Sequence, residues 1–597
     1  MKNFLAILCF SFCILILSKS FVMQKFSNAE FDYSKYSAIP ALKAGRVMPL
    51  ESAANDMLRL FSGKTSYKNF GKKINSVEWF LNFSADMENA KNQKFFRTTN
   101  RDLQKLLGIE GMYYSYNDLF SKIEEVEKIA NSNQRNVYVD SCYEALQKIE
   151  TFEILKYSLG YGSESKSQFV DEWYLSIANA KKEILNAKNE NREVSDIYLK
   201  KASDNLKKIS KQLEFEKMRP NSVVRVFADN GKFLTASEAL HKRDLSEDTQ
   251  IYLNSFAQFL DNLKAKNFDK AQKSFSFENI KESKNFRIKF ESFINTLDIN
   301  FAGTAIYGFS FLLFLFSYAF EKQRKNLIYC AMIFLFVAVC LHGFAILARC
   351  IIQMRPPVTN LYSSVFFAGW GAALLGYIMA KTKSKYIYAL SGTIAGIASL
   401  IVAMNLPYSG DDMGMMNAVL NSNFWLTAHV STIMIGYCAI FLGGFTAAIR
   451  LISIAFASKH CSVSSTKECS KSVYVILSIA LLFTFIGTML GGVWADLSWG
   501  RFWGWDPKEN GALMIVLWCA AALHCKLARM ISDRAFLAFA VFGNIVCAWA
   551  WFGVNMLGIG LHSYGFFQGK WFWLIAFVAS QFLIMTFAFF KESGKEK

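Results

Sequence analysis

The sequence predicts an α-helical polytopic integral membrane protein with about ten transmembrane helices and a mainly helical extracytoplasmic domain. The first observation is composition: the 597 residues are 53% hydrophobic, with 56 Phe and only 7 Pro, which excludes a disordered chain. The second is an uneven distribution of charge. Residues 1–300 hold 45 Lys/Arg and 38 Asp/Glu, whereas residues 301–597 hold only 21 and 10. The second half therefore has the composition of a membrane protein, and the first half is mostly water-soluble.

The first apolar run covers residues 4–22, after a charged start at Lys2. Signal peptides and uncleaved anchors share this pattern. Because no clear A-x-A cleavage site is present, we favour an N-terminal transmembrane anchor at residues 1–23 over a signal peptide. Residues 24–300 combine alternating charge with helical apolar spacing and few Gly or Pro, which predicts a mainly helical domain. That domain contains no metal or nucleotide motif, and its role is not predicted.

Nine long apolar runs follow within residues 301–597, and each approaches or exceeds the roughly 20 residues that span a bilayer. They lie at 301–320, 327–348, 362–380, 386–406, 424–452, 473–493, 511–530, 535–557 and 571–590.

The loops between these runs predict the topology. Basic loops such as 321–326 and 381–385 alternate with loops that hold few basic residues, and sixteen Lys/Arg fall on one side against five on the other. The positive-inside rule places the basic side in the cytoplasm. Both termini then lie inside, whereas residues 24–300 lie on the outer face of a bacterial inner membrane. The net charge of +18 therefore reflects topology, and we expect no nucleic-acid partner.

The twelve cysteines lie mostly in apolar runs, where a thiol acts as a small hydrophobe. No C-x-x-C occurs, which argues against a thioredoxin-type dithiol relay. No C-x-x-C-H occurs either, so the chain does not carry covalent c-type haem itself.

The densest chemical signal is the predicted outer loop at 492–510, which brings four tryptophans into twelve residues: Trp494, Trp499, Trp503 and Trp505. An alternative interpretation is an interfacial aromatic belt, since Trp is enriched where a membrane helix meets water. A belt does not require Trp, Gly and an Asp-Pro-Lys-Glu run starting at Asp506 in one short loop. Glycines let aromatic faces approach a flat ligand. The rings would supply stacking area, and Arg501 and Lys508 would meet carboxylates.

Histidines complete the candidate site. His429 and His562 lie at the same outer depth as the Trp-rich loop, and two neutral imidazoles are the parts needed for bis-His haem ligation. His524 lies in the cytoplasmic half of its span, where an ionisable residue is costly and usually functional. His342 lies in the outer half of another span, and the sequence leaves open whether it is a ligand or a structural residue. His241 and His460 have the pattern of solvated loop residues.

Together these residues resemble the CcsA/ResC family of cytochrome c biogenesis proteins, over about residues 327–590. The resemblance is carried by five segments rather than one motif. They are WGRFWGWDPKEN at 499–510, Leu523-His524, GVN at 553–555 with GLHSYG at 560–565, WLTAHVS at 425–431, and RPPVTNLYSS at 355–364. Ser363 departs from the family pattern, which leads us to expect an acidic residue there. The segment GRVMPL at 45–50 vaguely resembles an extracytoplasmic part of longer members.

The resemblance implies a haem exporter with cytochrome c synthase activity in complex with a CcsB/ResB-like partner. It implies that haem b is the transported substrate, received near His524 with a second ligand from the partner. His429 and His562 would then hold it at the Trp-rich loop, where an apocytochrome c C-x-x-C-H segment adds its thiols to the haem vinyls.

Three other functions compete with this one. A membrane electron-transfer subunit with stable bis-His haems would have paired His within facing spans, whereas the clearest pair here lies in outer loops. A transporter of another substrate would favour broken helices and charged pairs at mid-membrane, which are few. A haem-handling subunit of the other maturation system is disfavoured by the large exported domain.

Overall fold

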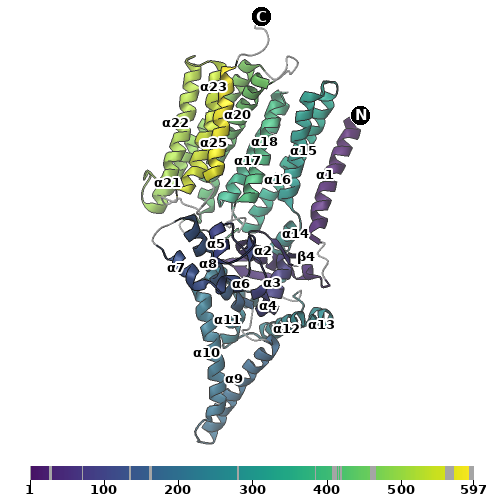
Figure 1. Cartoon of the computed structure of the whole chain (residues 1–597), viewed down its shortest axis with the longest axis vertical. Coiled ribbons are helices and arrows are strands. Elements are labelled where there is room, and N and C mark those ends of the chain that lie inside the picture. The colour runs from purple at the N-terminus through teal and green to yellow at the C-terminus, as the bar shows by residue number, and fades with distance from the viewer. Residues whose placement is uncertain are drawn as a thin grey trace. The chain divides into compact units, whose positions relative to one another are not determined.

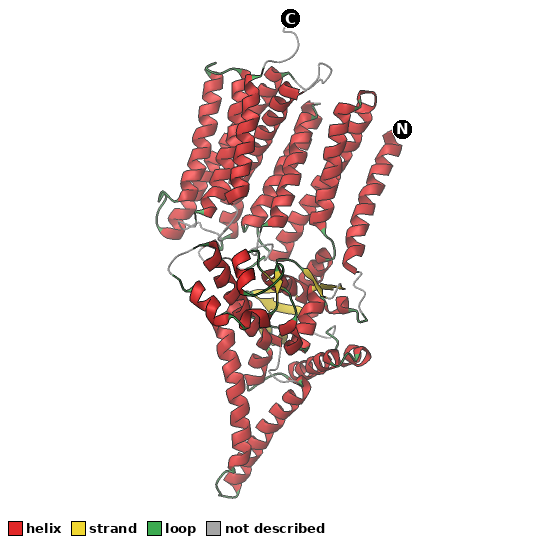
Figure 2. Cartoon of the chain, viewed as in Figure 1, coloured by secondary structure: helices red, strands yellow, loops and turns green. Residues whose placement is uncertain are grey.

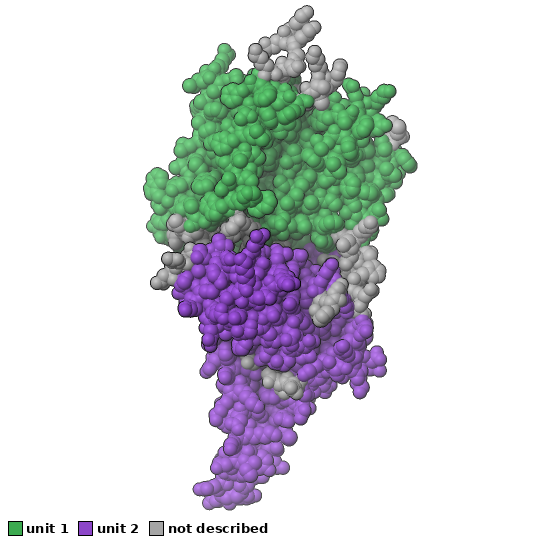
Figure 3. Space-filling model, viewed as in Figure 1, with its two compact units in different colours: residues 1–23, 297–597 green, residues 24–296 purple. Residues whose placement is uncertain are grey.

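A computed structural model describes residues 2–25, 30–69, 72–132, 136–159, 165–277, 281–383, 385–406, 413–414, 416, 420–456, 465–557 and 571–590. The chain divides into two compact units, which Figure 3 shows in different colours. The membrane unit comprises Met1–Met23 and Leu297–Lys597, and the second unit comprises Gln24–Thr296.

The membrane unit consists of helices, and the described residues contain nine helices that are long and apolar enough to cross a membrane. This confirms the predicted fold class, and the ends of the nine spans lie within seven residues of the ends of the nine predicted runs. The labelled helices that build these nine spans are α15 (Ile299–Ala319), α16 (Arg324–Gln353), α17 (Leu361–Lys383), α18 (Ile387–Asn405), α19 (Asn423–Trp425), α20 (Ser431–Phe456), α21 (Thr466–Trp499), α22 (Pro507–Leu527), α23 (Asp533–Ala548), α24 (Val554–Met556) and α25 (Trp571–Thr586) (Figures 1 and 2). Helices α19 and α20 belong to one span, Asn423–Phe456, and α23 and α24 to another, Asp533–Met556.

Helix α1 (Lys2–Lys25) packs against this bundle. The ring of Phe12 lies 4.8 Å from that of Phe309 on α15 and 6.1 Å from that of Phe334 on α16. Cys9 and Cys13 are buried on α1. One face of the first apolar segment is therefore covered by other helices of the membrane unit.

Small residues let pairs of membrane helices approach closely, as is usual where no hydrophobic effect drives association. A Cβ at Gly376 of α17 would lie 2.5 Å from the carbonyl oxygen of Tyr388 on α18. A Cβ at Gly436 of α20 would lie 2.4 Å from Cγ2 of Thr484 on α21. The α20–α21 contact matters for function, because both helices continue into the candidate site.

Several basic segments gather at one end of the membrane unit. Lys385, between α17 and α18, forms a 2.7 Å ion pair with Glu468 at the start of α21. Arg534, at the start of α23, donates to the carbonyl oxygen of Phe590, 2.9 Å away, after α25. The candidate site described below lies among the opposite ends of α20, α21 and α22.

The second unit is mainly helical, as predicted, but it also contains four two-stranded antiparallel sheets that the sequence did not predict. The strands pair as β1 (Pro40–Lys43) with β2 (Arg46–Pro49), β3 (Ser66–Asn69) with β4 (Lys72–Asn75), β5 (Phe96–Arg97) with β6 (Tyr113–Tyr114), and β7 (Phe227–Asp229) with β8 (Lys232–Leu234). Pro40 lies opposite Pro49 in the first hairpin, and Ser66 lies opposite Asn75 in the second. The strands have only two to four residues, too short for a period-2 pattern to emerge.

The helices of this unit surround an aromatic core. The rings of Phe61, Trp79, Phe95, Phe96 and Phe152 lie in mutual contact and are almost fully buried. Helices α9 and α10 meet near the turn that joins them and diverge away from it (Figure 1). The helices are α2 (Leu50–Ser62), α3 (Ser76–Ala85), α4 (Met87–Asn92), α5 (Arg101–Leu106), α6 (Tyr116–Phe120), α7 (Ile123–Ala130), α8 (Val137–Leu159), α9 (Lys166–Asn189), α10 (Asp196–Met218), α11 (Ala236–His241), α12 (Glu247–Lys264), α13 (Phe268–Ser274) and α14 (Phe286–Asn295).

The GRVMPL segment forms the turn and second strand of the first hairpin. Ala44 and Gly45 both have positive φ angles, 48° and 77°, which is the geometry of a type I′ turn. Arg46 then reaches α14, where its guanidinium donates to both carboxylate oxygens of Glu291 at 2.6 and 3.0 Å. Burial raises the pKa of nearby Glu51 to about 7. This segment therefore connects the first hairpin to the last helix of the unit.

Candidate functional site

A cavity of about 220 Å3 lies in the membrane unit, and several residues predicted from the sequence meet there. Its walls come from the start of α17, the segment before α20, the end of α21, the start of α22 and the segment after α23. The predicted site residues that line it are His429, Trp494, Trp499, Trp503 and Lys508.

His429 lies in a π-helical turn, Leu426–Val430, that interrupts the helix leading into α20. Its Nδ1 is 2.7 Å from the carbonyl oxygen of Gly487 on α21. A carbonyl accepts only, so Nδ1 carries the hydrogen and Nε2 holds the lone pair that a metal ion requires. A metal-ligating His usually donates its other N–H to a carbonyl or carboxylate in this way. A neighbouring helix therefore fixes the tautomer and the orientation of the imidazole.

Gly491 provides the space for this imidazole. A Cβ at that position would lie 2.6 Å from Cε1 and 3.0 Å from Nδ1 of His429. The ring of Trp494, one turn further along α21, lies 5.8 Å from the imidazole at an interplanar angle of 61°. The spacing of Gly487, Gly491 and Trp494 thus places an acceptor, a gap and an aromatic ring on one face of α21.

The Trp-rich segment is more helical than the sequence predicted. Helix α21 continues through Trp499, so the connection between α21 and α22 covers residues 500–506 instead of the predicted 492–510. Gly500 ends the helix at a φ of 69°, with its N–H bonded to the carbonyl of Asp496. The sequence contains no Pro between 492 and 500, and Gly491 and Gly492 are tolerated inside the helix because His429 and the Phe502 ring occupy the space beside them.

The charged residues of this connection mainly hold it together. Arg501 donates from Nη1 to Oε1 of Glu509 at 3.0 Å. The other carboxylate oxygen of Glu509 accepts from the backbone N–H groups of Gly504 and Asp506, at 2.8 and 3.1 Å. Asp506 caps α22 through a reciprocal capping box with Glu509. Arg501 and Asp506 do not line the cavity, whereas Lys508 does.

Trp505 stands apart from the other predicted tryptophans. It is 70% exposed and does not line the cavity. Its φ of 56° is a genuine outlier for a bulky residue. Its ring meets that of Trp503 edge-on at 6.0 Å, so its contact with the site is indirect.

The other predicted histidines differ from His429. His524 is exposed near the end of α22, and its Nδ1 is 2.8 Å from the carbonyl oxygen of Ala520 on the same helix. His342 is buried on α16, with its Nδ1 3.4 Å from the hydroxyl oxygen of Tyr307. His241 is exposed at the end of α11. His562 and His460 lie outside the described residues.

The segment RPPVTNLYSS supplies a second wall of the cavity and explains the departure at Ser363. Asn360 accepts from the N–H of Ser363 at 2.8 Å, and the Ser363 hydroxyl accepts from the N–H of Asn360 at 2.9 Å. This is the reciprocal arrangement of a capping box, whose third helical position usually holds Glu or Gln. Serine makes the same cap here, so the loss of the acidic residue leaves the start of α17 intact.

Some lining residues were missed by sequence reasoning. Trp551, in a second π-helical turn (Trp549–Gly553), donates from Nε1 to the hydroxyl of Ser364 at 3.1 Å. Asn555 lies one turn further, on α24. The GVN segment marked this region, but no spacing rule assigned a role to its asparagine.

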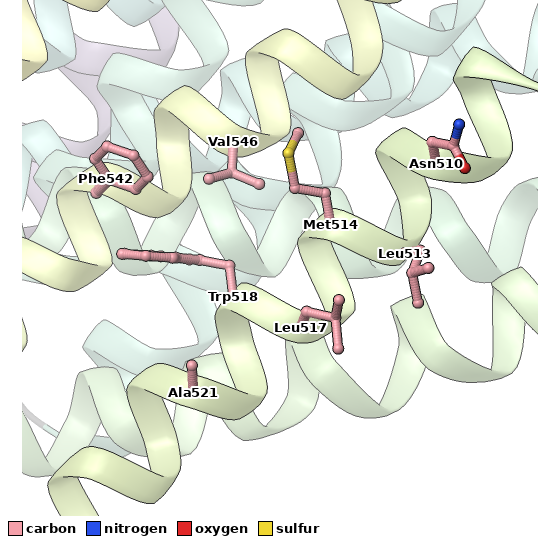
Figure 4. Close-up of a pocket in the computed structure, with 8 residues that line it drawn as sticks. All are labelled: Asn510, Leu513, Met514, Leu517, Trp518, Ala521, Phe542 and Val546. Atoms are coloured by element: carbon pink, nitrogen blue, oxygen red, sulfur yellow. The ribbon is translucent and has the colours of Figure 1, made fainter.

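A second hollow of about 460 Å3 lies between α22 and α23 (Figure 4). Apart from the amide of Asn510, its lining is apolar: Leu513, Met514, Leu517, Trp518, Ala521, Phe542 and Val546. Its lining includes the Met514 thioether but no histidine and no charged side chain, whereas the cavity at His429 combines an imidazole with aromatic walls and a lysine, so the cavity at His429 is the candidate site.

Comparison with known proteins agrees with the resemblance drawn from the motifs. Residues 358–562 match a family model described as cytochrome C assembly protein. The chain is 32% identical over 239 residues to cytochrome c biogenesis protein CcsA of Synechococcus sp. (strain CC9902), covering 35% of this chain and 78% of that protein. It is 33% identical over 241 residues to CcsA of Parasynechococcus marenigrum (strain WH8102), covering 36% and 79%. It is 31% identical over 251 residues to CcsA of Porphyra purpurea, covering 35% of this chain and 78% of that protein.

The chain belongs to the CcsA family. It is therefore a multi-pass membrane protein of cytochrome c biogenesis, a process that implies the handling of haem. The family match falls within the membrane unit and contains the cavity-lining residues named above, whereas residues 24–296 lie outside it.

Proposed function

We propose that this CcsA-family chain carries haem across the bacterial inner membrane and presents it for covalent attachment to apocytochrome c. The observation that carries the proposal is the His429 imidazole, whose Nδ1 is fixed 2.7 Å from the Gly487 carbonyl in a tryptophan-lined cavity. In this proposal Nε2 of His429 is one axial ligand of the iron of haem b, and His562 is the other. Trp494, Trp499 and Trp503 pack against the macrocycle, Lys508 meets a carboxylate, and Arg501, Asp506 and Trp505 shape the connection.

The topology follows from the charge of the loops. The end of the membrane unit that holds the Lys385–Glu468 pair and Arg534 is cytoplasmic under the positive-inside rule. The cavity and residues 24–296 then lie on the periplasmic face, with both chain termini inside. The packing of Phe12 against α15 and α16 supports an anchor in the first segment.

His524 receives haem before the outer cavity does. Its imidazole is exposed and, within the described residues, contacts Ala520 of its own helix, so in this proposal a second axial ligand comes from another protein. We assign that role to a CcsB/ResB-like membrane partner. At the outer cavity, each apocytochrome thiol adds across a haem vinyl: sulfur bonds to one vinyl carbon, the thiol proton goes to the other, and nothing is oxidised. The chain therefore acts as a synthase only within such a complex.

A maturation assay tests this function. The chain and a ResB-like partner are produced with a reporter apocytochrome c in a bacterium that lacks its own maturation genes, and covalent haem is detected on a denaturing gel. We expect covalent haem only when the chain is present. A chain that binds haem tightly but never yields covalent haem on the reporter would instead be the alternative, an electron-transfer subunit with stable bis-His haems.

A further inference from the structure

Asn555 on α24 carries a buried side-chain amide. It is 1% exposed, and neither its Nδ2 nor its Oδ1 has a hydrogen-bond partner in the described part of the chain. Most buried polar side chains are hydrogen-bonded, because leaving such a group unpaired costs the full desolvation penalty. This asparagine also lines the cavity at His429. Its unmet hydrogen bonds therefore border the space that a ligand would fill.

Two neighbouring residues, Trp551 and Asn544, show how Asn555 differs from other polar groups near the cavity. Trp551, four residues earlier, lines the same cavity and is anchored by its bond to Ser364. Asn544, on the preceding helix, is also fully buried, but its Nδ2 donates to Gln581 at 3.0 Å and it does not line the cavity. Asn544 thus has one of its two polar side-chain atoms paired, whereas both polar side-chain atoms of Asn555 lack a partner among the described residues.

The charges of the cavity indicate what the amide would meet. Lys508 contributes a positive charge to the lining. Glu509 also lines it, but its carboxylate already accepts from Arg501 and from two backbone N–H groups. An ammonium and an unpaired amide N–H are donors that suit a carboxylate, whereas the tryptophan rings suit a flat apolar surface.

We infer that Nδ2 of Asn555 donates a hydrogen bond to a carboxylate of the haem held in this cavity and so fixes the orientation of the macrocycle. This inference rests on the proposed function. Haem b carries its propionates away from its vinyl groups. With a propionate held at Asn555 and Lys508, the vinyl edge turns away from this wall, toward the side from which thiols of an apocytochrome would approach.

The test uses the purified full chain in detergent and measures its affinity for haemin and for haemin dimethyl ester, whose propionates are uncharged. Asn555→Leu keeps the size of the side chain and removes the amide. Asn555→Asp places a carboxylate beside the position of the propionate. Asn423→Leu, at an exposed asparagine near His429 in sequence, is the matched control. Thermal unfolding of each haem-free variant reports on the fold.

Loss of a hydrogen bond to a charged group should weaken haemin binding by about 10- to 100-fold in Asn555→Leu. Asn555→Asp should lose still more haemin affinity, and Asn423→Leu should lose none. For the dimethyl ester, the loss of affinity caused by Asn555→Leu should be smaller than the loss for haemin. The haem-free Asn555→Leu protein should unfold at the wild-type temperature or above it, since the amide it loses has no partner.

Equal haemin affinity in wild type and Asn555→Leu would overturn this inference while leaving the proposed function standing. The same would follow from equal losses for haemin and its ester, because the amide would then meet something other than a carboxylate. No binding of haemin by the wild-type chain would overturn both.

Discussion

His429 and His524 lie at the two ends of the membrane unit and differ in almost every feature that makes a histidine a ligand. His429 is held by the carbonyl of another helix, has a glycine opposite its ring and faces a cavity with aromatic walls. His524 is exposed, bonds to its own helix and lines neither of the two hollows described above. The contrast teaches that the surroundings of His429 are built largely within this chain, whereas His524 fits the proposed function only if a second protein supplies the other ligand.

The largest expected effect comes from removing an outer ligand. His429→Ala should abolish cytochrome c maturation, because the iron loses an axial ligand that Trp494 and the other rings cannot replace. His562→Ala should do the same. Maturation is measured as covalent haem on the reporter cytochrome, relative to the amount of chain in the membrane. Normal maturation in either variant would refute the assignment of that histidine.

The space beside His429 offers a test that leaves every ligand in place. In Gly491→Ala the new methyl group would overlap the imidazole, so the ring must move away from the Gly487 carbonyl. Disturbing the orientation of a metal-bound His typically costs about 10- to 100-fold in affinity. We expect a loss of that size in the haem affinity of the purified variant.

Gly308→Ala on α15 is the matched control, since a Cβ there would meet nothing within 4 Å. If both variants retain wild-type haem affinity, the glycine at 491 has no bearing on the ligand, and the geometry described for His429 does not matter.

His524→Ala should sharpen the comparison by separating loading from binding. His524 follows Lys508 by sixteen positions on α22, about 24 Å along the helix at 1.5 Å per residue. The outer cavity is therefore unaltered in the variant but poorly filled in cells. Haem content of the purified complex should fall, and haemin added afterwards should bind as in wild type. Full loading in cells would show that haem arrives by another route.

The smallest effects concern the tryptophans, where the structure divides a group that the sequence treated as one. Trp503 lines the cavity, whereas Trp505 is largely exposed. Trp503→Leu should reduce haem affinity by about 0.5–1.5 kcal/mol, the usual contribution of an aromatic contact beyond burial. Trp505→Leu should cost less. Haemin titration of the two variants measures the difference, and a larger loss in Trp505→Leu would contradict the placement of the site.

The sequence predicted the membrane fold well because the length and polarity of a span are local properties. It marked His429, Trp494 and Lys508 as site residues because their motifs are local too. It did not predict that α21 continues through Trp499, since the Phe502 ring and His429 fill the space beside Gly491 and Gly492 only in three dimensions. Nor did it predict the role of Asn555, because an unpaired amide is recognised only once its neighbours are known. The short β-hairpins of the second unit were not predicted for a related reason, because strands of two to four residues are too short to show an alternating apolar pattern.

The most direct test of the central claim is the coordination of iron in the purified chain. Absorption and electron paramagnetic resonance spectra of wild type and His429→Gly, each loaded with haemin, report on the axial ligands. We predict a six-coordinate low-spin spectrum in wild type, its loss in His429→Gly, and its return when imidazole fills the space left by the side chain. A low-spin bis-His spectrum that persists in His429→Gly without imidazole would contradict the account.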